Sequence, residues 1–110
     1  MEIISYKINK SSGIKFEAKE GENIFGWAYL YIMYNDLHQE PFGFLENVFV
    51  KEEYRGKGMG KKLIDSVIKE AKRQNCYKLV GTSRYERGDV HTMYEKLGFK
   101  DYGKEFRLDL

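Results

Sequence analysis

The chain has 110 residues, enough for one domain with a hydrophobic core and too few for two ordinary domains. Its composition is 42% hydrophobic and 15% aromatic, which excludes a disordered chain, and its net charge of only +2 excludes a general polyanion-binding surface. We therefore expect a single globular domain over residues 1–110, in which any functional basic character is local.

Cysteine and hydropathy patterns indicate a cytoplasmic protein. Cys76 is the only cysteine and cannot form an internal disulfide, which suits a reducing compartment. No apolar run reaches the length of a membrane span, and the N-terminal residues lack a signal-peptide core. His38 and His91 have no cysteine or carboxylate cluster around them at metal-ligand spacing, so we expect neither a membrane partner nor a metal.

The first half of the chain has the pattern of antiparallel strands. Residues 1–8 alternate loosely and residues 13–19 alternate clearly between apolar and polar, so we expect them to form a hairpin. Residues 23–34 are rich in aromatic and branched side chains, which predicts a long, largely buried strand that could also supply a homodimer interface. A polar turn leads to a further strand at 42–50, so a second hairpin is expected.

The second half of the chain has a helical pattern. Apolar residues recur at helical spacing from Gly60 to about Gln74, and a short strand is expected at 77–82. A strand, a helix and a strand in this order predict a right-handed parallel βαβ unit. A second helix is expected at 89–97, followed by Gly98 and a closing hairpin over 99–110. The predicted class is α/β (α+β), with antiparallel strands leading into one parallel pair.

A glycine-rich basic loop, EYRGKGMGK at residues 53–61, joins the strand at 42–50 to the first helix. The first amides of a helix lack internal partners and carry partial positive charge, so this position suits a phosphate or pyrophosphate. A Walker A loop is excluded because Lys62 stands where serine or threonine is required. The dinucleotide fingerprint GxGxxG is excluded by the spacing of the three glycines. Taken alone, the loop could also be a flexible basic turn, which is the less favoured alternative.

Two motifs together give the chain a resemblance to a known family. Residues 55–60, RGKGMG, fit the R/Q-x-x-G-x-G/A signature of the GNAT superfamily of acetyltransferases, and the surrounding LENVFVKEEYRGKGMGKKLID resembles its motif A. Further on, HTMYEKLGF resembles a second signature, a helix with a tyrosine followed by xxxGF. The motifs occur in the family's order and spacing, and the resemblance covers residues from about 42 to the C-terminus.

The resemblance implies a binding site for acetyl-CoA as co-substrate. The pantetheine arm would pair with the backbone of Val48, Phe49 and Val50 like an added strand. The pyrophosphate would lie on the backbone amides of the loop, whose residues are Arg55, Gly56, Lys57, Gly58, Met59, Gly60 and Lys61.

Two side chains are candidates for acid–base catalysis. Tyr94, in the second signature, is expected to donate a proton to the leaving thiolate. Glu46 is a carboxylate within an apolar strand, where burial would raise its pKa towards that of a useful general base. A solvent-facing or lysine-paired Glu46 is equally open, and Glu40 and His38 are weaker alternatives for the base.

The sequence departs from the family pattern at two points. Family members often carry an asparagine seven residues before the tyrosine, where this chain has Arg87. Many also carry helices between the first two strands, where residues 9–13 leave no room for them, which suggests an open acceptor side.

The function expected from the resemblance is transfer of acetyl from acetyl-CoA to an amine of a small molecule or protein, by direct attack in a ternary complex. The alternative is a non-catalytic or regulatory acyl-CoA-binding module. Nucleic-acid binding through the basic loop is disfavoured by the low net charge and by Glu52 and Glu53 beside it.

Overall fold

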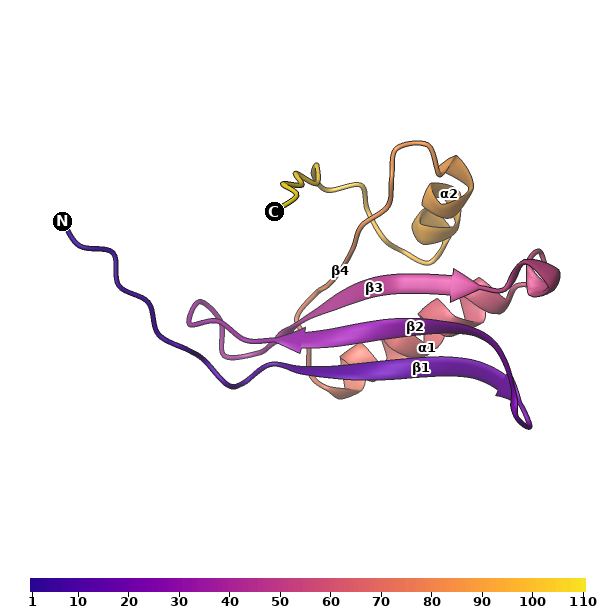
Figure 1. The fold of residues 1–110 in the computed structure, drawn as a ribbon, viewed down its shortest axis with the longest axis horizontal. Helices are drawn as coiled ribbons and strands as arrows, with labels where there is room; N and C mark the ends of the chain where they lie inside the picture. The colour runs from indigo at the N-terminus through magenta and orange to yellow at the C-terminus, as the bar shows by residue number, and fades with distance from the viewer. The chain divides into compact units, whose positions relative to one another are not determined.

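A computed structural model describes all 110 residues of the chain. Its contacts divide into two compact units, Met1–Val80 and Gly81–Leu110, and each is described here by itself. A single domain over the whole chain therefore stays a prediction. The elements are β1 (Ser12–Glu20), β2 (Asn23–Met33), β3 (Phe42–Val50), a 3-10 turn η1 (Glu52–Tyr54), α1 (Met59–Arg73), β4 (Leu79–Gly81) and α2 (Gly88–Lys96) (Figure 1).

The strands form one mixed sheet in the order β1-β2-β3-β4. The first three strands are antiparallel neighbours, and β1 turns into β2 through Gly21, whose φ of 60° is readily adopted by glycine. Beside β3, Tyr77 donates to the carbonyl of Pro41 and Gly43 donates to the carbonyl of Lys78. Because the paired residue numbers rise together, this last pairing is parallel. The expected βαβ unit and the α+β class are confirmed.

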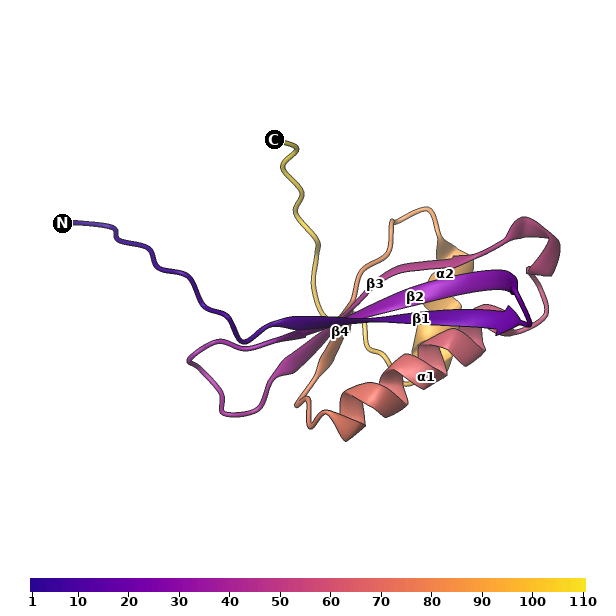
Figure 2. The same cartoon turned by 60° about the horizontal axis from the view of Figure 1, so that its bottom comes forward.

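Helix α1 covers one face of the sheet, as Figure 2 shows from below. The period of 3.6 places its apolar side chains on one stripe, and these pack on alternate residues of β2 and on Leu45 of β3. The buried core of this unit consists of Ala28, Leu30, Ile32, Leu45, Leu63, Ile64, Val67 and Ala71. No helix in the structure is both long and apolar enough to cross a membrane.

Two strand predictions are wrong. Residues 1–11 before β1 and residues 99–110 after α2 contain no strand, although both were expected to form hairpins. A strand is stable only when its backbone groups pair with a neighbour, and a lone two-stranded hairpin is marginal in water. Strand β1 takes β2 as its partner instead, so residues 9–13 do not separate two strands.

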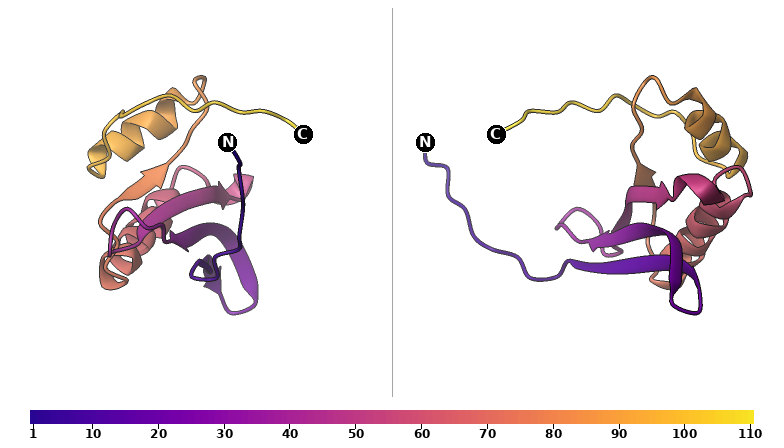
Figure 3. Two further views of the ribbon diagram at one scale, coloured as in Figure 1. Left: turned by 90° about the vertical axis from the view of Figure 1, so that its left-hand side faces the viewer. Right: turned by 45° about the vertical axis from the view of Figure 1, so that its right-hand side comes forward.

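The C-terminal unit is built around α2 (Figure 3). The helix ends at Lys96 and is followed by Leu97 and by Gly98, which has a φ of 102°, and the amide of Phe99 donates to the carbonyl of Tyr94. This arrangement satisfies carbonyls that the last helical turn leaves unpaired. The sequence prediction of a helix closed by Gly98 is therefore confirmed.

Candidate active site

The regular pairing of β3 with β2 is interrupted by a bulge in the middle of the predicted donor-binding strand. Trp27 pairs with Phe49 and Tyr29 pairs with Glu46, so two residues of β3 stand opposite one residue of β2. One of them, Asn47, has a φ of 52°, in the left-handed region that asparagine tolerates better than most residues. A bulge leaves the extra residue out of the ladder. Backbone groups of β3 are therefore turned out of the sheet beside Val48.

Glu46 lies directly before this bulge. Its side chain is exposed, and its Oε1 accepts a hydrogen bond from the Asn47 amide at 3.2 Å. Of the alternatives left open for Glu46, the structure shows the solvent-facing one, because Glu46 lies on the sheet face opposite to buried Leu45. Of the two weaker candidates for the base, Glu40 is exposed and His38 stacks on Tyr77, with ring centroids 4.1 Å apart.

The loop after β3 presents its backbone amides at the start of α1. Gly56 and Gly58 have φ values of 77° and 78°, conformations that glycine adopts without strain. Among the backbone hydrogen bonds of the loops and turns, none is donated by the amide of Gly56, Lys57 or Gly58. The first helical bond at this end runs from Lys62 to the carbonyl of Gly58 at 3.1 Å, so the amides of the first turn point outward.

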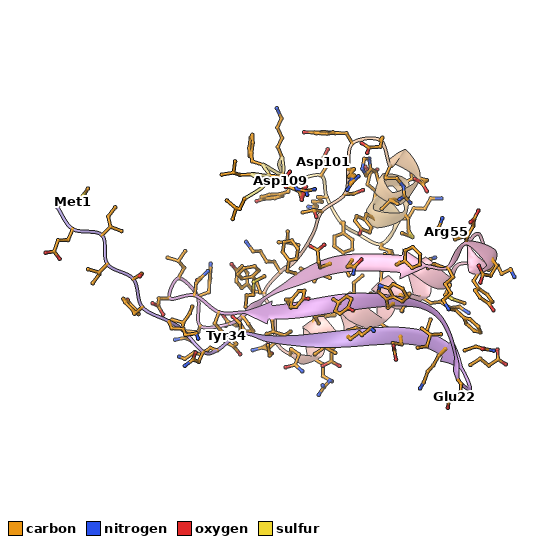
Figure 4. The ribbon with its side chains drawn as sticks, in the orientation of Figure 1. Met1, Glu22, Tyr34, Arg55, Asp101 and Asp109 are labelled. Carbon is orange, nitrogen blue, oxygen red and sulfur yellow. The ribbon has the colours of Figure 1, made fainter.

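Arg55 ties the loop to the end of β3. Its Nε donates to the carbonyl of Val50 at 2.8 Å, and its guanidinium lies 5.3 Å from the ring centroid of Phe49. Figure 4 shows the labelled Arg55 beyond the carboxyl end of β3. The structure therefore brings three of the predicted donor-binding residues together, and Arg55 fixes the loop as well as adding positive charge.

The remaining loop residues add charge and packing. Lys57 Nζ lies 5.8 Å from the ring centroid of Tyr54, which in turn packs on Phe25 with ring centroids 4.2 Å apart. Lys61 is exposed on the first turn of α1, and Met59 is half-buried. Gly60 has no left-handed φ, and a Cβ there would meet Val50 Cγ2 at 3.8 Å, an ordinary contact. This position therefore has room for alanine.

Tyr94 lies in α2, in the C-terminal unit. Its ring is half-buried and packs on Phe99, with centroids 5.1 Å apart. The contact with Phe99, the last residue of the second signature, thus helps to position the Tyr94 ring. Whether Tyr94 serves as the general acid stays a prediction.

Two further polar residues noted in the sequence, His91 and Arg87, also have partners in this unit. His91 Nε2 lies 2.8 Å from the Arg84 carbonyl, which engages the imidazole in the turn before the helix. Arg87 donates to Asp89 at 3.4 Å, and this hydrogen bond holds the pKa of the Asp89 carboxyl below its usual range. An acidic residue in the first turn of a helix is also favoured by the helix dipole. Arg87 therefore has a local structural partner.

The family model of the acetyltransferase (GNAT) family matches residues 2–99 of the chain, which is most of its length. The chain belongs to the GNAT acetyltransferase family.

Individual GNAT relatives match parts of the chain. A glucosamine 6-phosphate N-acetyltransferase of Trypanosoma brucei brucei is 38% identical over 68 residues, 62% of this chain and 44% of that protein. An aminoglycoside N(6')-acetyltransferase type 1 of Stenotrophomonas maltophilia is 29% identical over 87 residues, 76% of this chain and 56% of that protein. The crystal structure of a Trypanosoma brucei acetyltransferase, 35% identical, superposes with a TM-score of 0.74, covering 79% of this chain and 60% of that one. This chain spans less than two thirds of each of the three.

Two features of this GNAT chain were missed by the sequence analysis. The first is the bulge at Asn47, for which the polar pair Glu46-Asn47 inside an apolar strand was the available signal. The second is the aromatic face that Tyr29 and Tyr31 form opposite α1. Their alternation with buried Leu30 has a period of two, the signal of a strand with only one buried face.

Proposed function

We propose that the chain is an N-acetyltransferase that uses acetyl-CoA as donor and acts by direct attack of an amine while both substrates are bound. The observation that carries this proposal is the junction of a bulged strand with a left-handed glycine loop. The bulge turns backbone out of the sheet beside Val48, and the loop opens the amides of Gly56 and Gly58 at a helix N-terminus. The backbone turned out at the bulge suits an amide-bearing arm, and the open amides of the loop suit an anion.

The residues present fit acetyl-CoA. The amide of Arg55 donates to the carbonyl of Glu52 at 3.2 Å, so the amides from Gly56 onward, with Lys57 and Lys61, would hold the pyrophosphate. The backbone of Val48 to Val50 would hold the pantetheine arm. Acetyl-CoA, when bound, supplies an acyl group activated as a thioester. An outward-facing amide at the bulge would stabilise negative charge on the carbonyl oxygen as the amine attacks.

The two candidate catalytic side chains would move protons. The carboxylate of Glu46 takes a proton from the ammonium, which frees the lone pair of the nitrogen. As the N–C bond forms and the C–S bond breaks, the phenol of Tyr94 donates a proton to sulfur. The nitrogen loses two protons: the first reaches solvent through Glu46, and the second, released as the amide forms, restores the proton that Tyr94 gave to the sulfur.

The acceptor of this reaction is an amine. The two curated relatives are named for acceptors of this kind, glucosamine 6-phosphate and aminoglycosides, which supports an amine as the acceptor class here. A non-catalytic acyl-CoA-binding module is the alternative, and it would need only the loop and the bulge.

A phenylalanine at position 94 tests the proposed role of Tyr94 as the general acid. Tyr94→Phe keeps the ring that packs on Phe99 but removes the proton. We expect kcat in a thiol-release assay to fall about 100-fold, the scale of general acid catalysis, with an unchanged Kd for acetyl-CoA by calorimetry. Tyr85→Phe is the matched control, since Tyr85 lies in the same unit and is 82% exposed.

The outcomes are distinct. If the wild-type chain does not bind acetyl-CoA, the proposed donor site is wrong. If it binds acetyl-CoA but transfers acetyl to no amine or peptide of a broad panel, the binding module replaces the enzyme. Equal rates for Tyr94→Phe and Tyr85→Phe would remove Tyr94 as the acid while leaving the transferase.

A further inference from the structure

An open concavity of about 610 Å³ lies on the sheet face opposite α1. We propose that it binds the acceptor and selects a monoamine carried on an apolar or aromatic body. This inference rests on the proposed function and specifies its second substrate. The concavity has a volume typical of small-molecule sites. Its lining consists of Gly13, Tyr31, Met33, Phe44 and Glu46, together with Ser11 and Ser12.

The position of the lining residues in the sheet places the concavity opposite the core. Tyr31 alternates along β2 with Leu30 and Ile32, which are buried against the α1 side. Phe44 pairs with Tyr31 across the strands, so both rings lie on one face. Each ring is at least partly accessible, and Tyr31 is 40% exposed. The two residues therefore give the concavity an aromatic wall.

Gly13 keeps the space beside this wall open. It pairs with Tyr31 from the other side, and a Cβ at position 13 would lie 3.1 Å from two atoms of the tyrosine ring. That contact is tighter than ordinary van der Waals packing. A larger residue would therefore press on Tyr31 and fill part of the concavity.

The charge of the lining favours one ammonium group. Glu46 is the only charged side chain that lines the concavity, and its single hydrogen bond, from Asn47, uses one of about four lone-pair positions. An ammonium beside Glu46 could also lie over an aromatic face, which adds a favourable cation–π contact. Because the bulge follows Glu46 immediately, an amine bound here lies next to the backbone proposed to hold the thioester.

The same lining disfavours two other classes of amine. No lysine or arginine lines the concavity, so a phosphate on the acceptor would lie near Glu46 without a cation to pair with it. The nearest cation along β1, Lys15, is paired with Glu17 at 3.4 Å. A polyamine would bring several charges to a single carboxylate. A monoamine with an apolar body matches both the aromatic wall and the single negative charge.

The test compares three amines with the full chain at saturating acetyl-CoA. We expect kcat/KM in a thiol-release assay to be about tenfold or more higher for 2-phenylethylamine than for glucosamine 6-phosphate or spermidine. Tyr31→Ala should raise KM for 2-phenylethylamine about tenfold and leave kcat within about twofold, because it removes binding and not chemistry. The Kd for acetyl-CoA should not change.

Tyr77→Ala is the matched control for Tyr31→Ala. Tyr77 is 41% exposed, against 40% for Tyr31, and it does not line the concavity. A preference for glucosamine 6-phosphate or spermidine would overturn the inference and leave the proposed function standing, as would equal KM values for the two variants. Acetyl-CoA binding without any binding or turnover of 2-phenylethylamine would overturn it as well. Failure to bind acetyl-CoA at all would instead reject the proposed function.

Discussion

The two faces of the sheet are built from the same strands but carry different side chains. Against α1, Leu30 and Ile32 are at most 3% exposed and form part of the core. On the opposite face, the neighbouring residues Tyr29 and Tyr31 remain partly exposed and stack on each other, with centroids 6.2 Å apart. Alternate residues of one strand can therefore serve stability on one face and recognition on the other.

The bulge at Asn47 interrupts this alternation between core-facing and open-facing residues. Before it, residues of β3 alternate regularly, with Leu45 in the core and Phe44 on the open face. At the bulge the alternation breaks, and the strand turns backbone groups outward where regular pairing would have used them. A local defect in the sheet thus supplies polar groups that a regular strand would hide.

Truncating two adjacent residues of β2, one on each face of the sheet, should give the largest difference in stability between the faces. Leu30→Ala should lower the free energy of unfolding by about 2–5 kcal/mol, because Leu30 is fully buried and its removal leaves a cavity. Tyr31→Ala should lower it by about 1 kcal/mol or less, since its ring lies half in water. Urea denaturation followed by circular dichroism measures both. Equal losses for the two variants would contradict the assignment of the faces.

Replacing one glycine on each face with alanine should give a smaller difference in the free energy of unfolding. At Gly26, on the α1 side, a Cβ would lie 2.5 Å from the backbone oxygen of Phe49, which cannot move without shifting β3. Gly26→Ala should therefore lower the free energy of unfolding by about 1–3 kcal/mol. Gly13→Ala meets only the side chain of Tyr31, which can turn, and should lower it by less than about 1 kcal/mol. A larger loss at Gly13 than at Gly26 would reverse the comparison.

The donor loop can be examined with a similar pair of variants. Gly58→Ala forces a side chain into a left-handed backbone, which costs about 1–2 kcal/mol and should raise the Kd for acetyl-CoA about tenfold. Gly60→Ala needs no such conformation and has room beside Val50, so its Kd should change by less than about threefold. Calorimetric titration measures both values. Equal effects at the two positions would show that backbone conformation does not set donor affinity.

Thiol reactivity gives the smallest contrast between the two faces. Cys76 Sγ would lie 3.7 Å from a Cβ at Gly43, beside Leu30 on the core side, and burial raises the pKa of this thiol. Iodoacetamide at pH 8 should therefore react roughly several-fold more slowly with Cys76 than with Tyr31→Cys in a Cys76→Ser background. Reaction of Cys76 at the faster rate would show that it is open to solvent.

The parts of the fold predicted correctly are those with strong local patterns. Helix α1 follows from its apolar spacing, β1 from clear alternation, and the end of α2 from Gly98. The strands expected at 1–8 and 99–110 do not form, because pairing depends on a partner that local alternation cannot specify. Strand β2 was expected to be largely buried, but only alternate residues are, since α1 covers one face alone.

The donor side of the candidate site was easier to predict than the acceptor side. The loop carries its chemistry in consecutive residues, so glycine spacing and charge indicated an anion site, and the second motif was needed to favour a CoA donor over a flexible basic turn. The exposure of Glu46 depends on which sheet face it occupies, and the local sequence left both a buried and a solvent-facing carboxylate open. The concavity proposed to bind the acceptor combines Gly13, Tyr31 and Phe44 from three strands, which only the strand register brings together.

The most direct test of the account is amide chemical-shift mapping of the isotope-labelled chain during titration with acetyl-CoA. We expect the largest shifts at the amides of Gly56 and Gly58 in the loop and of Val48 at the bulge, because these backbone groups are proposed to contact the donor. The amide of Lys15 on β1 should move little. Saturable binding that shifts other amides and leaves the loop and bulge unchanged would contradict the proposed donor site.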